Sequence, residues 1–190
     1  MRIIGGAFGG RRLAGLGQGD PFARLRPTSD RVRESLFNVL MSRHAERLVE
    51  ARVLDLFAGS GALGLEALSR GAQEALFVEN GRAALRLLRD NIARCEVENR
   101  ASVLARDARR LGDAPGTPYD LVFLDPPYGR SLGEAALDVV LQGGWIARDA
   151  LVIWEEGGPV QAPPELDLQD ERRSGGTFIR IYGLRQRVSS

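Results

Sequence analysis

The sequence predicts an α/β domain whose sheet is mainly parallel and is covered by helices on both faces. From residue 52 onward, short apolar runs typical of buried strands alternate with segments whose apolar residues recur at helical spacing. Near the C-terminus, two segments instead alternate polar and apolar residues around Ser174-Gly175-Gly176, the pattern of an antiparallel β-hairpin. The length of 190 residues fits one domain of ordinary size with a short appendage.

The first predicted helix follows a segment rich in Gly and Arg. Residues 28–30 offer capping hydroxyls and a carboxylate, and apolar residues then follow at helical spacing, so we expect a helix over about 30–46. Arg31 and Arg33 fall outside that apolar stripe, and we expect them to face solvent or a ligand. The preceding residues, 1–27, suit a small hairpin or an arm that lies on the rest of the protein.

The remaining elements alternate along the chain. Strands are expected at 52–57, 75–79, 102–105, 119–125 and 151–155, and helices at 62–70, 82–94 and 134–141. The antiparallel hairpin at the edge of the sheet is formed by 166–172 and 177–184. We divide the chain into a basic N-terminal arm, 1–30, and a main domain, 31–190.

The composition excludes several classes of protein. The longest apolar run has five residues, far below the about 20 that a membrane-spanning helix needs, and the N-terminus lacks the apolar stretch of a secretory signal. A single cysteine, Cys95, excludes an internal disulfide, and with His44 as the only histidine there are too few ligands for a Cys- or His-based metal site. We expect a cytoplasmic, metal-free protein in which Cys95 and His44 are structural.

The charge is distributed unevenly along the chain. All 26 basic residues are arginine, and segments 1–33 and 172–190 each carry a net charge of +5, whereas 34–171 carries −9. A GC-rich genome explains the choice of arginine over lysine, but it does not explain two basic ends. These ends suggest contact with a polyanion such as a nucleic acid, although solvated tails would give a similar pattern.

A glycine-rich motif marks a candidate cofactor site. Gly59, Gly61 and Gly64 form Gly-x-Gly-x-x-Gly at a predicted strand-to-helix turn, where glycines allow the backbone to approach a ligand closely. Glu79 ends the next predicted strand 20 residues after Gly59, where an acid can accept hydrogen bonds from ribose hydroxyls. This combination favours a nucleoside-type cofactor over a tight turn without a ligand.

Asp55 indicates which cofactor it is. A dinucleotide delivers its pyrophosphate to the helix N-terminus, and a carboxylate four residues before the first glycine is a poor neighbour for that group. We place Asp55 at the mouth of the turn, where it suits the ammonium or sulfonium of S-adenosylmethionine. The pattern D-x-F-x-G-S-G resembles motif I of the class I methyltransferases, which bind this cofactor on a Rossmann-like fold.

That resemblance implies a set of cofactor-binding residues, which are Asp55, Phe57, Ala58, Gly59, Ser60, Gly61, Glu79, Asn80, Asp107 and Ala108. Asp107 follows the third predicted strand, where such enzymes usually place an acid that faces the adenine amino group. Taken alone, Asp107 also suits a surface acid or a helix cap.

Asp125-Pro126-Pro127-Tyr128 is the candidate catalytic motif. The prolines fix the backbone and remove two N–H donors, so the carboxylate of Asp125 and the carbonyl of Pro126 can both accept from an exocyclic amino group. This directs the nitrogen lone pair out of the ring's conjugation and toward a methyl group. Tyr128 offers a flat face for a flipped-out base. The tetrapeptide resembles the (D/N)-P-P-(Y/F) motif of methyltransferases that act on amino groups of bases or of glutamine.

The N-terminal part carries the more specific resemblance. Residues 2–6 (RIIGG) and 25–38 (LRPTSDRVRESLFN) resemble the N-terminal signature of the RsmD family, and residues 54–71 and 125–128 match its other motifs in the same order. Members of that family methylate the N2 amino group of a guanine in bacterial 16S rRNA, on assembled or assembling 30S subunits. The resemblance implies the same activity, cofactor and partner for this chain, which we expect to be a monomer.

On this interpretation, residues near the N-terminus hold the RNA backbone, namely Arg11, Arg12, Arg26, Thr28, Arg31 and Arg33. Pairing of Arg31 or Arg33 with Glu34 or with acids of the main domain is the alternative. The chain departs from the family at Gly9, where a basic residue is usual, and at Asn80, where a second acid is common. Three other functions stay open: adenine-N6 methylation of RNA or DNA, nucleotide-dependent oxidoreduction, and a catalytically silent RNA-binding assembly factor.

Overall fold

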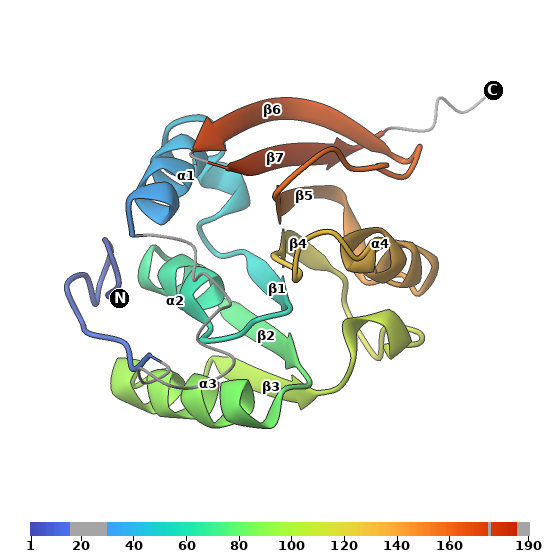
Figure 1. Cartoon of the computed structure of the whole chain (residues 1–190). Coiled ribbons are helices and arrows are strands. Elements are labelled where there is room, and N and C mark those ends of the chain that lie inside the picture. Colours follow the sequence, from blue (N-terminus) through green and yellow to red (C-terminus); the bar gives the residue numbers. More distant parts are fainter. Residues whose placement is uncertain (16–29, 175, 186–190) are drawn as a thin grey trace.

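The computed structural model describes residues 1–15, 30–174 and 176–185. A seven-stranded sheet with the order β3-β2-β1-β4-β5-β7-β6 forms its centre (Figure 1). The strands are β1 (Arg52–Leu56), β2 (Glu74–Glu79), β3 (Ala101–Ala105), β4 (Tyr119–Leu124), β5 (Ile146–Glu156), β6 (Leu166–Ser174) and β7 (Thr177–Leu184). Strands β1 to β5 pair in parallel, whereas β7 lies antiparallel to both β5 and β6.

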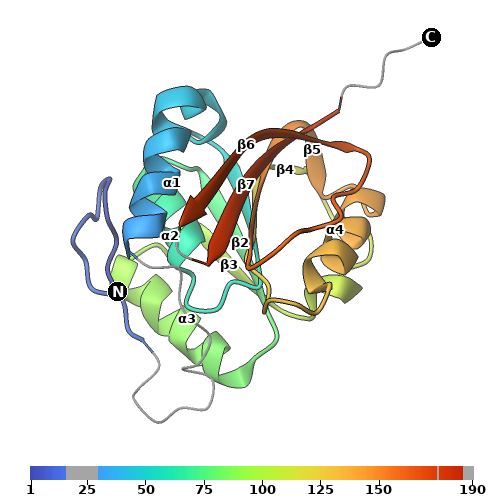
Figure 2. The same cartoon turned by 45° about the horizontal axis from the view of Figure 1, so that its top comes forward.

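Helices cover both faces of this sheet. They are α1 (Asp30–Arg43), α2 (Ala62–Ser69), α3 (Arg82–Cys95), α4 (Leu132–Gln142) and the short 3₁₀ helices η2 (Ala45–Arg47) and η3 (Ala108–Arg110). Helices α1, α2 and α3 pack on one face, and α4 and η3 pack on the other (Figures 1 and 2). None of the helices in the described residues is long and apolar enough to cross a membrane.

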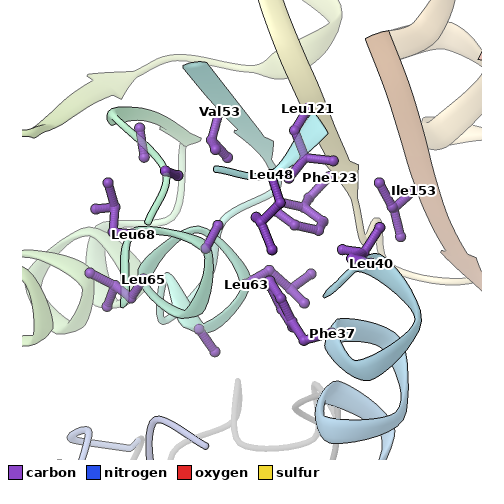
Figure 3. Packing of buried hydrophobic residues seen from close by; sticks show 14 of the residues in the cluster. Phe37, Leu40, Leu48, Val53, Leu63, Leu65, Leu68, Leu121, Phe123 and Ile153 are labelled. Atoms are coloured by element: carbon purple, nitrogen blue, oxygen red, sulfur yellow. The ribbon is translucent and has the colours of Figure 1, made fainter. Parts of the chain in front are cut away.

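The strands supply both cores because successive side chains point to opposite faces. Val53 and Phe123 belong to the cluster on the side of α1 to α3, whereas their neighbours Leu54 and Leu124 belong to the cluster under α4. Phe37 of α1 is completely buried, and its ring centroid lies 5.8 Å from that of Phe123 (Figure 3). Both sheet faces are therefore closed, which leaves the ends of the strands as the place for a site.

The predicted fold class is confirmed, and the differences lie at element boundaries. Strand β5 begins at Ile146, before the predicted start at 151, and it pairs irregularly with β4 there. Its first residues include the exposed pair Arg148-Asp149, which hides a strand in a search for apolar runs. Helix α1 ends at Arg43 rather than near 46, and η2 follows after His44.

Residues 1–15 form an arm that packs on α2 and α3, with one antiparallel bridge, Arg2 to Arg12, in place of a full hairpin ladder. The Glu66 carboxylate of α2 accepts hydrogen bonds from the Ile4 and Gly5 amides at 2.7 and 3.0 Å. Three apolar side chains of the arm are buried in the core on the α1–α3 side, namely Ile3, Phe8 and Leu13. The arm is therefore part of the packed structure as far as residue 15.

Candidate active site

The motifs singled out in the sequence meet at the carboxyl edge of the sheet, because their strands are parallel neighbours. Strand β1 lies between β2 and β4, and its last residue, Leu56, is opposite Val78 and Leu124. The residue after Leu56 begins the glycine-rich turn. The residue after Val78 is Glu79, and the residue after Leu124 begins the Asp125–Tyr128 motif. Ligands of open α/β sheets bind at this edge.

The glycine-rich turn has three residues with positive φ: Phe57 at 60°, Gly59 at 55° and Gly61 at 78°. A Cβ on Gly61 would lie 2.5 Å from a leucine of α3, and one on Gly64 would lie 2.4 Å from a phenylalanine of β2, so helix packing closes both positions. A Cβ on Gly59 would meet only the Phe57 carbonyl, at 3.9 Å. The backbone at Gly59 is therefore the part of the turn that a ligand can approach closely.

Asp55 lies beneath this turn rather than at its mouth, so that expectation is wrong. Its side chain is 2% exposed, and Oδ2 accepts a hydrogen bond from the Gly64 amide at 3.0 Å. Burial raises the pKa of Asp55 to about 8. The hydrogen bond from the Gly64 amide lowers this pKa, and the negative charge of Glu79 raises it further. Asp55 thus joins the end of β1 to the first turn of α2 and holds the glycine-rich turn from below.

Glu79 joins the turn to the start of α3. Its Oε2 accepts from the Gly59 amide at 2.9 Å, and its Oε1 accepts from the Asn80 and Gly81 amides at 2.8 and 2.6 Å. A carboxylate has about four acceptor positions, so Oε2 retains capacity for a ribose hydroxyl. The side chain is partly exposed, and Asn80 next to it is exposed.

The other cofactor-turn residues contribute mainly backbone. The Ala58 amide donates to the Val78 carbonyl at 3.0 Å, and the Ala58 side chain is buried. Ser60 is partly exposed, and its carbonyl accepts a hydrogen bond from Asn91.

Asp107 caps η3, which is the alternative that its sequence position also allows. It accepts from the Arg109 amide at 2.9 Å, and the Arg109 guanidinium binds its two oxygens at 3.0 and 2.6 Å. These side-chain hydrogen bonds lower the pKa of Asp107. Ala108 is buried in the core under α4. In this structure the Asp107 carboxylate is thus held by Arg109 at the carboxyl end of β3.

The Asp125–Tyr128 motif follows β4 directly, as predicted. Pro126 is buried, while Asp125 and Pro127 are partly exposed. Tyr128 is 42% exposed, so one part of its ring is accessible from solvent. The motif therefore presents a carboxylate and an aromatic ring beside the glycine-rich turn.

Three residues that the sequence analysis missed hold the Tyr128 ring. The phenol donates a hydrogen bond to Glu155 Oε1 at 2.9 Å and lies 3.2 Å from Thr177 Oγ1. A Cβ on Gly157 would lie 2.8 Å from the ring, so this glycine lets the backbone pack against the tyrosine. Burial raises the pKa of Tyr128, and the nearby carboxylates of Glu155 and Asp125 add to the effect. The phenol therefore stays protonated and remains a donor.

Asn91 of α3 is a further missed residue, and it connects the arm to the cofactor turn. Its side chain is completely buried. Its Nδ2 donates to the Ser60 carbonyl at 2.9 Å and to the Ala14 carbonyl at 3.3 Å, while Oδ1 accepts from the Ala14 amide at 2.7 Å. The available signal was a polar residue on the same helical face as Leu88 and Cys95.

The predicted RNA-facing residues separate into distinct groups. Arg12 and Arg31 are exposed, whereas Arg11 donates to the Arg94 carbonyl at 2.7 Å and keeps a side-chain exposure of 34%. Arg33 is completely buried, and its guanidinium binds Asp30 at 3.0 Å and the Arg2 carbonyl. The expectation that Arg33 faces solvent is therefore wrong, because this side chain joins α1 to the arm. Arg26 and Thr28 lie outside the described residues.

The two residues interpreted as structural do not belong to the site. Cys95 is buried in the core at the end of α3, where burial raises the pKa of its thiol. His44 lies between α1 and η2. Within the part of the chain that the structure describes, no group of three or more His, Cys, Asp and Glu side chains is placed to hold a metal ion.

The strand order, the glycine-rich turn and the adjoining Asp125–Tyr128 motif define a Rossmann-like domain of the class I methyltransferase type. A solved structure of a putative methyltransferase, yhhF, from Escherichia coli has a TM-score of 0.82 and 40% identity over 97% of both chains. The family model described as "Conserved hypothetical protein 95" matches residues 1–183. The chain belongs to this family, which is the RsmD family.

Curated relatives support the same assignment. Ribosomal RNA small subunit methyltransferase D of Escherichia coli is 42% identical over 185 residues, which cover 96% of this chain and 89% of that protein. The putative rRNA methyltransferase YlbH of Bacillus subtilis is 34% identical over 191 residues, which cover 97% of this chain and 100% of that protein.

Proposed function

We propose that this protein transfers a methyl group from S-adenosylmethionine to the exocyclic N2 amino group of a guanine in 16S rRNA. It acts in the cytoplasm as a monomer, on assembled or assembling 30S subunits. The observation that carries the proposal is the adjacency of Gly59, Glu79 and Asp125–Tyr128 at one sheet edge. The relatives named ribosomal RNA small subunit methyltransferase D support the choice of RNA.

The residues at the turn fit S-adenosylmethionine. Gly59 leaves open space above its backbone, and Glu79 is fixed by three amides with acceptor capacity remaining for a ribose. Asp55 supplies a buried acid below the turn, and Asp107 lies further along the same edge. When bound, this cofactor supplies an electrophilic methyl group on a cationic sulfur.

Asp125 and the Pro126 carbonyl accept the two hydrogens of the guanine amino group. Held in this way, the amino nitrogen would present its lone pair to the electrophilic methyl group that the bound cofactor would supply. The nitrogen releases its proton to solvent after transfer, so no strong base is needed. Positioning by these residues supplies most of the acceleration, since the leaving group is already activated.

Tyr128 stacks on the flipped-out guanine. Base–aromatic stacking contributes about 1–3 kcal/mol per base, and the phenol's hydrogen bond to Glu155 fixes the ring plane. The basic arm, 1–30, holds the RNA backbone through Arg11 and Arg12, together with Arg31 at the start of the main domain, 31–190. Arg26 and Thr28 complete this proposed set. Arg33 is removed from it because of its burial.

Substitution of the catalytic motif tests the proposal. Asp125→Ala is expected to lower methyl transfer to small subunits at least a thousandfold, while the dissociation constant for S-adenosylmethionine changes by less than about fivefold. Asp113→Ala, which removes an exposed acid outside the site, serves as the matched control and should behave as wild type. Near-normal turnover of Asp125→Ala would contradict the assignment.

Two substitutions of Tyr128 separate the contribution of ring stacking from that of the phenol's hydrogen bond. Tyr128→Phe keeps the ring and should retain transfer within about tenfold, whereas Tyr128→Ala loses a stacking energy of about 1–3 kcal/mol, or roughly 5- to 150-fold. The measurement is kcat/KM with subunits as the varied substrate. Equal activity of Tyr128→Ala and wild type would remove the ring from the mechanism.

A further inference from the structure

A cavity of about 190 Å³ lies between α1 and the end of β6. Helix α1 contributes Arg31, Val32 and Ser35 to its lining, and β6 contributes Arg172, Arg173 and Ser174. Figures 1 and 2 both show the end of β6 beside α1. This α1–β6 cavity is thus lined by three arginines and two hydroxyls that come from segments far apart in the sequence.

The α1–β6 cavity carries excess positive charge. Arg172 pairs with Asp170 at 3.2 Å, and Arg43 approaches the same carboxylate oxygen at 3.7 Å, so one acid faces two guanidinium groups. Arg31 forms no salt bridge with any carboxylate among the described residues. Arg173 faces away from α1, because successive strand side chains point to opposite faces and its guanidinium lies 5.4 Å from the centroid of the Phe178 ring on the other side of the hairpin.

The cavity also lies close to the aromatic ring of the catalytic motif. Ser174, in the cavity lining, pairs in register with Thr177 across the hairpin. Thr177 Oγ1 in turn lies 3.2 Å from the hydroxyl of Tyr128. Cα atoms of directly paired strand residues are roughly 5 Å apart. The backbone on either side of a base stacked on Tyr128 would therefore pass near the cavity.

We propose that the α1–β6 cavity binds RNA backbone phosphates that flank the target nucleotide. This inference rests on the proposed function and adds the C-terminal hairpin to the RNA-contacting surface. Arg31 and Arg172 are the principal contacts, and Arg43 adds positive charge beside Asp170. Guanidinium groups bind phosphate oxygens in a bidentate manner, and such contacts position a substrate without reading its sequence. The cavity would thus orient the guanine while Asp125–Tyr128 acts on it.

The test measures binding of 30S subunits by the full-length protein without cofactor, at several salt concentrations. Each phosphate contact contributes about 0.7–0.9 to the slope of log affinity against log salt. The double variant Arg31→Gln/Arg172→Gln should therefore lower the magnitude of that slope by roughly 1.4–1.8, and affinity at low salt should fall at least tenfold. Binding of S-adenosylmethionine should be unchanged.

Two controls make the result specific. Arg47→Gln/Arg148→Gln removes two arginines at the amino ends of the inner strands β1 and β5, whereas the cavity lies at the carboxyl end of β6, and this variant should leave the slope unchanged. Arg172→Lys keeps the charge and should retain the wild-type slope when combined with native Arg31. A slope equal to wild type in Arg31→Gln/Arg172→Gln would overturn the proposal.

Charged residues on the edge strand β6 can also serve to prevent pairing between molecules, and sedimentation of the same variants tests this. Self-association of Arg31→Gln/Arg172→Gln with an unchanged salt slope would overturn the phosphate assignment. The two proposals fail separately because binding is measured without transfer. Normal binding by the wild-type protein without methyl transfer to any nucleotide would overturn the proposed function alone. Normal methyl transfer by the wild-type protein, together with an unchanged salt slope in the double variant, would overturn only the proposal that the cavity binds phosphates.

Discussion

Asp55 illustrates how a residue under the site affects the whole protein. The pKa of its carboxyl is raised by burial from 3.8 to about 8, so the folded protein retains a proton that the unfolded chain has lost. Between these two pKa values the folded state binds more protons than the unfolded state. The free energy of unfolding that depends on Asp55 therefore falls as pH rises from about 4 to about 8.

Asp55→Asn should remove this dependence, because an amide does not titrate and still offers an acceptor to the Gly64 amide. The free energy of unfolding of wild type should fall with pH more steeply than that of the variant, by at most about 1.4 kcal/mol per pH unit. Urea unfolding at a series of pH values between 4.5 and 8.5 measures both slopes. Asp113→Asn, at an exposed position, is the control, and parallel curves for Asp55→Asn and wild type would refute the buried-proton explanation.

At the scale of elements, the N-terminal arm offers a test through two glycines with similar backbone angles. Gly6 has φ of 80° and Gly10 has φ of 84°, but a Cβ on Gly6 would lie 1.9 Å from the Ser69 carbonyl of α2, whereas one on Gly10 would meet nothing within 4 Å. Gly6→Ala should therefore destabilise the protein by about 1–3 kcal/mol more than Gly10→Ala. Denaturant unfolding of the two variants gives the comparison, and equal losses would show that the arm does not pack closely on α2.

Asn91 of α3 forms hydrogen bonds with both the N-terminal arm and the cofactor turn, so its substitution should also affect the cofactor turn. Asn91→Leu leaves the partly buried amide of Ala14 and the carbonyl of Ser60 without this partner, which costs about 1–3 kcal/mol. We expect a lower melting temperature and an S-adenosylmethionine affinity reduced about tenfold. Calorimetric titration and thermal unfolding check this.

Asp90→Asn, on the exposed side of the same helix, is the matched control for Asn91→Leu and should change neither quantity. Wild-type cofactor affinity in a destabilised Asn91→Leu would mean that the arm and the turn are independent.

At the scale of the whole molecule, the sequence contains enough information for the order of elements. Apolar runs such as 121–124 are buried on both sheet faces and mark strands independently of tertiary context. The register of parallel strands then brings the glycine-rich turn beside Asp125–Tyr128 without further assumptions. For this reason the fold class and the edge that carries the site could be predicted.

The missed features depend on contacts between distant segments. Arg33 appears outside the apolar stripe of α1, yet the arm covers it, and the Arg33 guanidinium donates a hydrogen bond to the Arg2 carbonyl of the arm. Glu66 and Glu155 are acids inside apolar stretches, and only the folded chain brings them the partners that make their burial favourable. Local pattern shows which residues are apolar, but not which polar residues are partnered.

The measurement that tests the central claim most directly is methyl transfer from labelled S-adenosylmethionine to small ribosomal subunits from a strain lacking this gene. Free rRNA and DNA are tested in parallel, and the modified nucleoside is identified by mass spectrometry. We predict N2-methylguanosine from the subunits. N6-methyladenine, or cofactor binding without label in any substrate, would contradict the proposed activity.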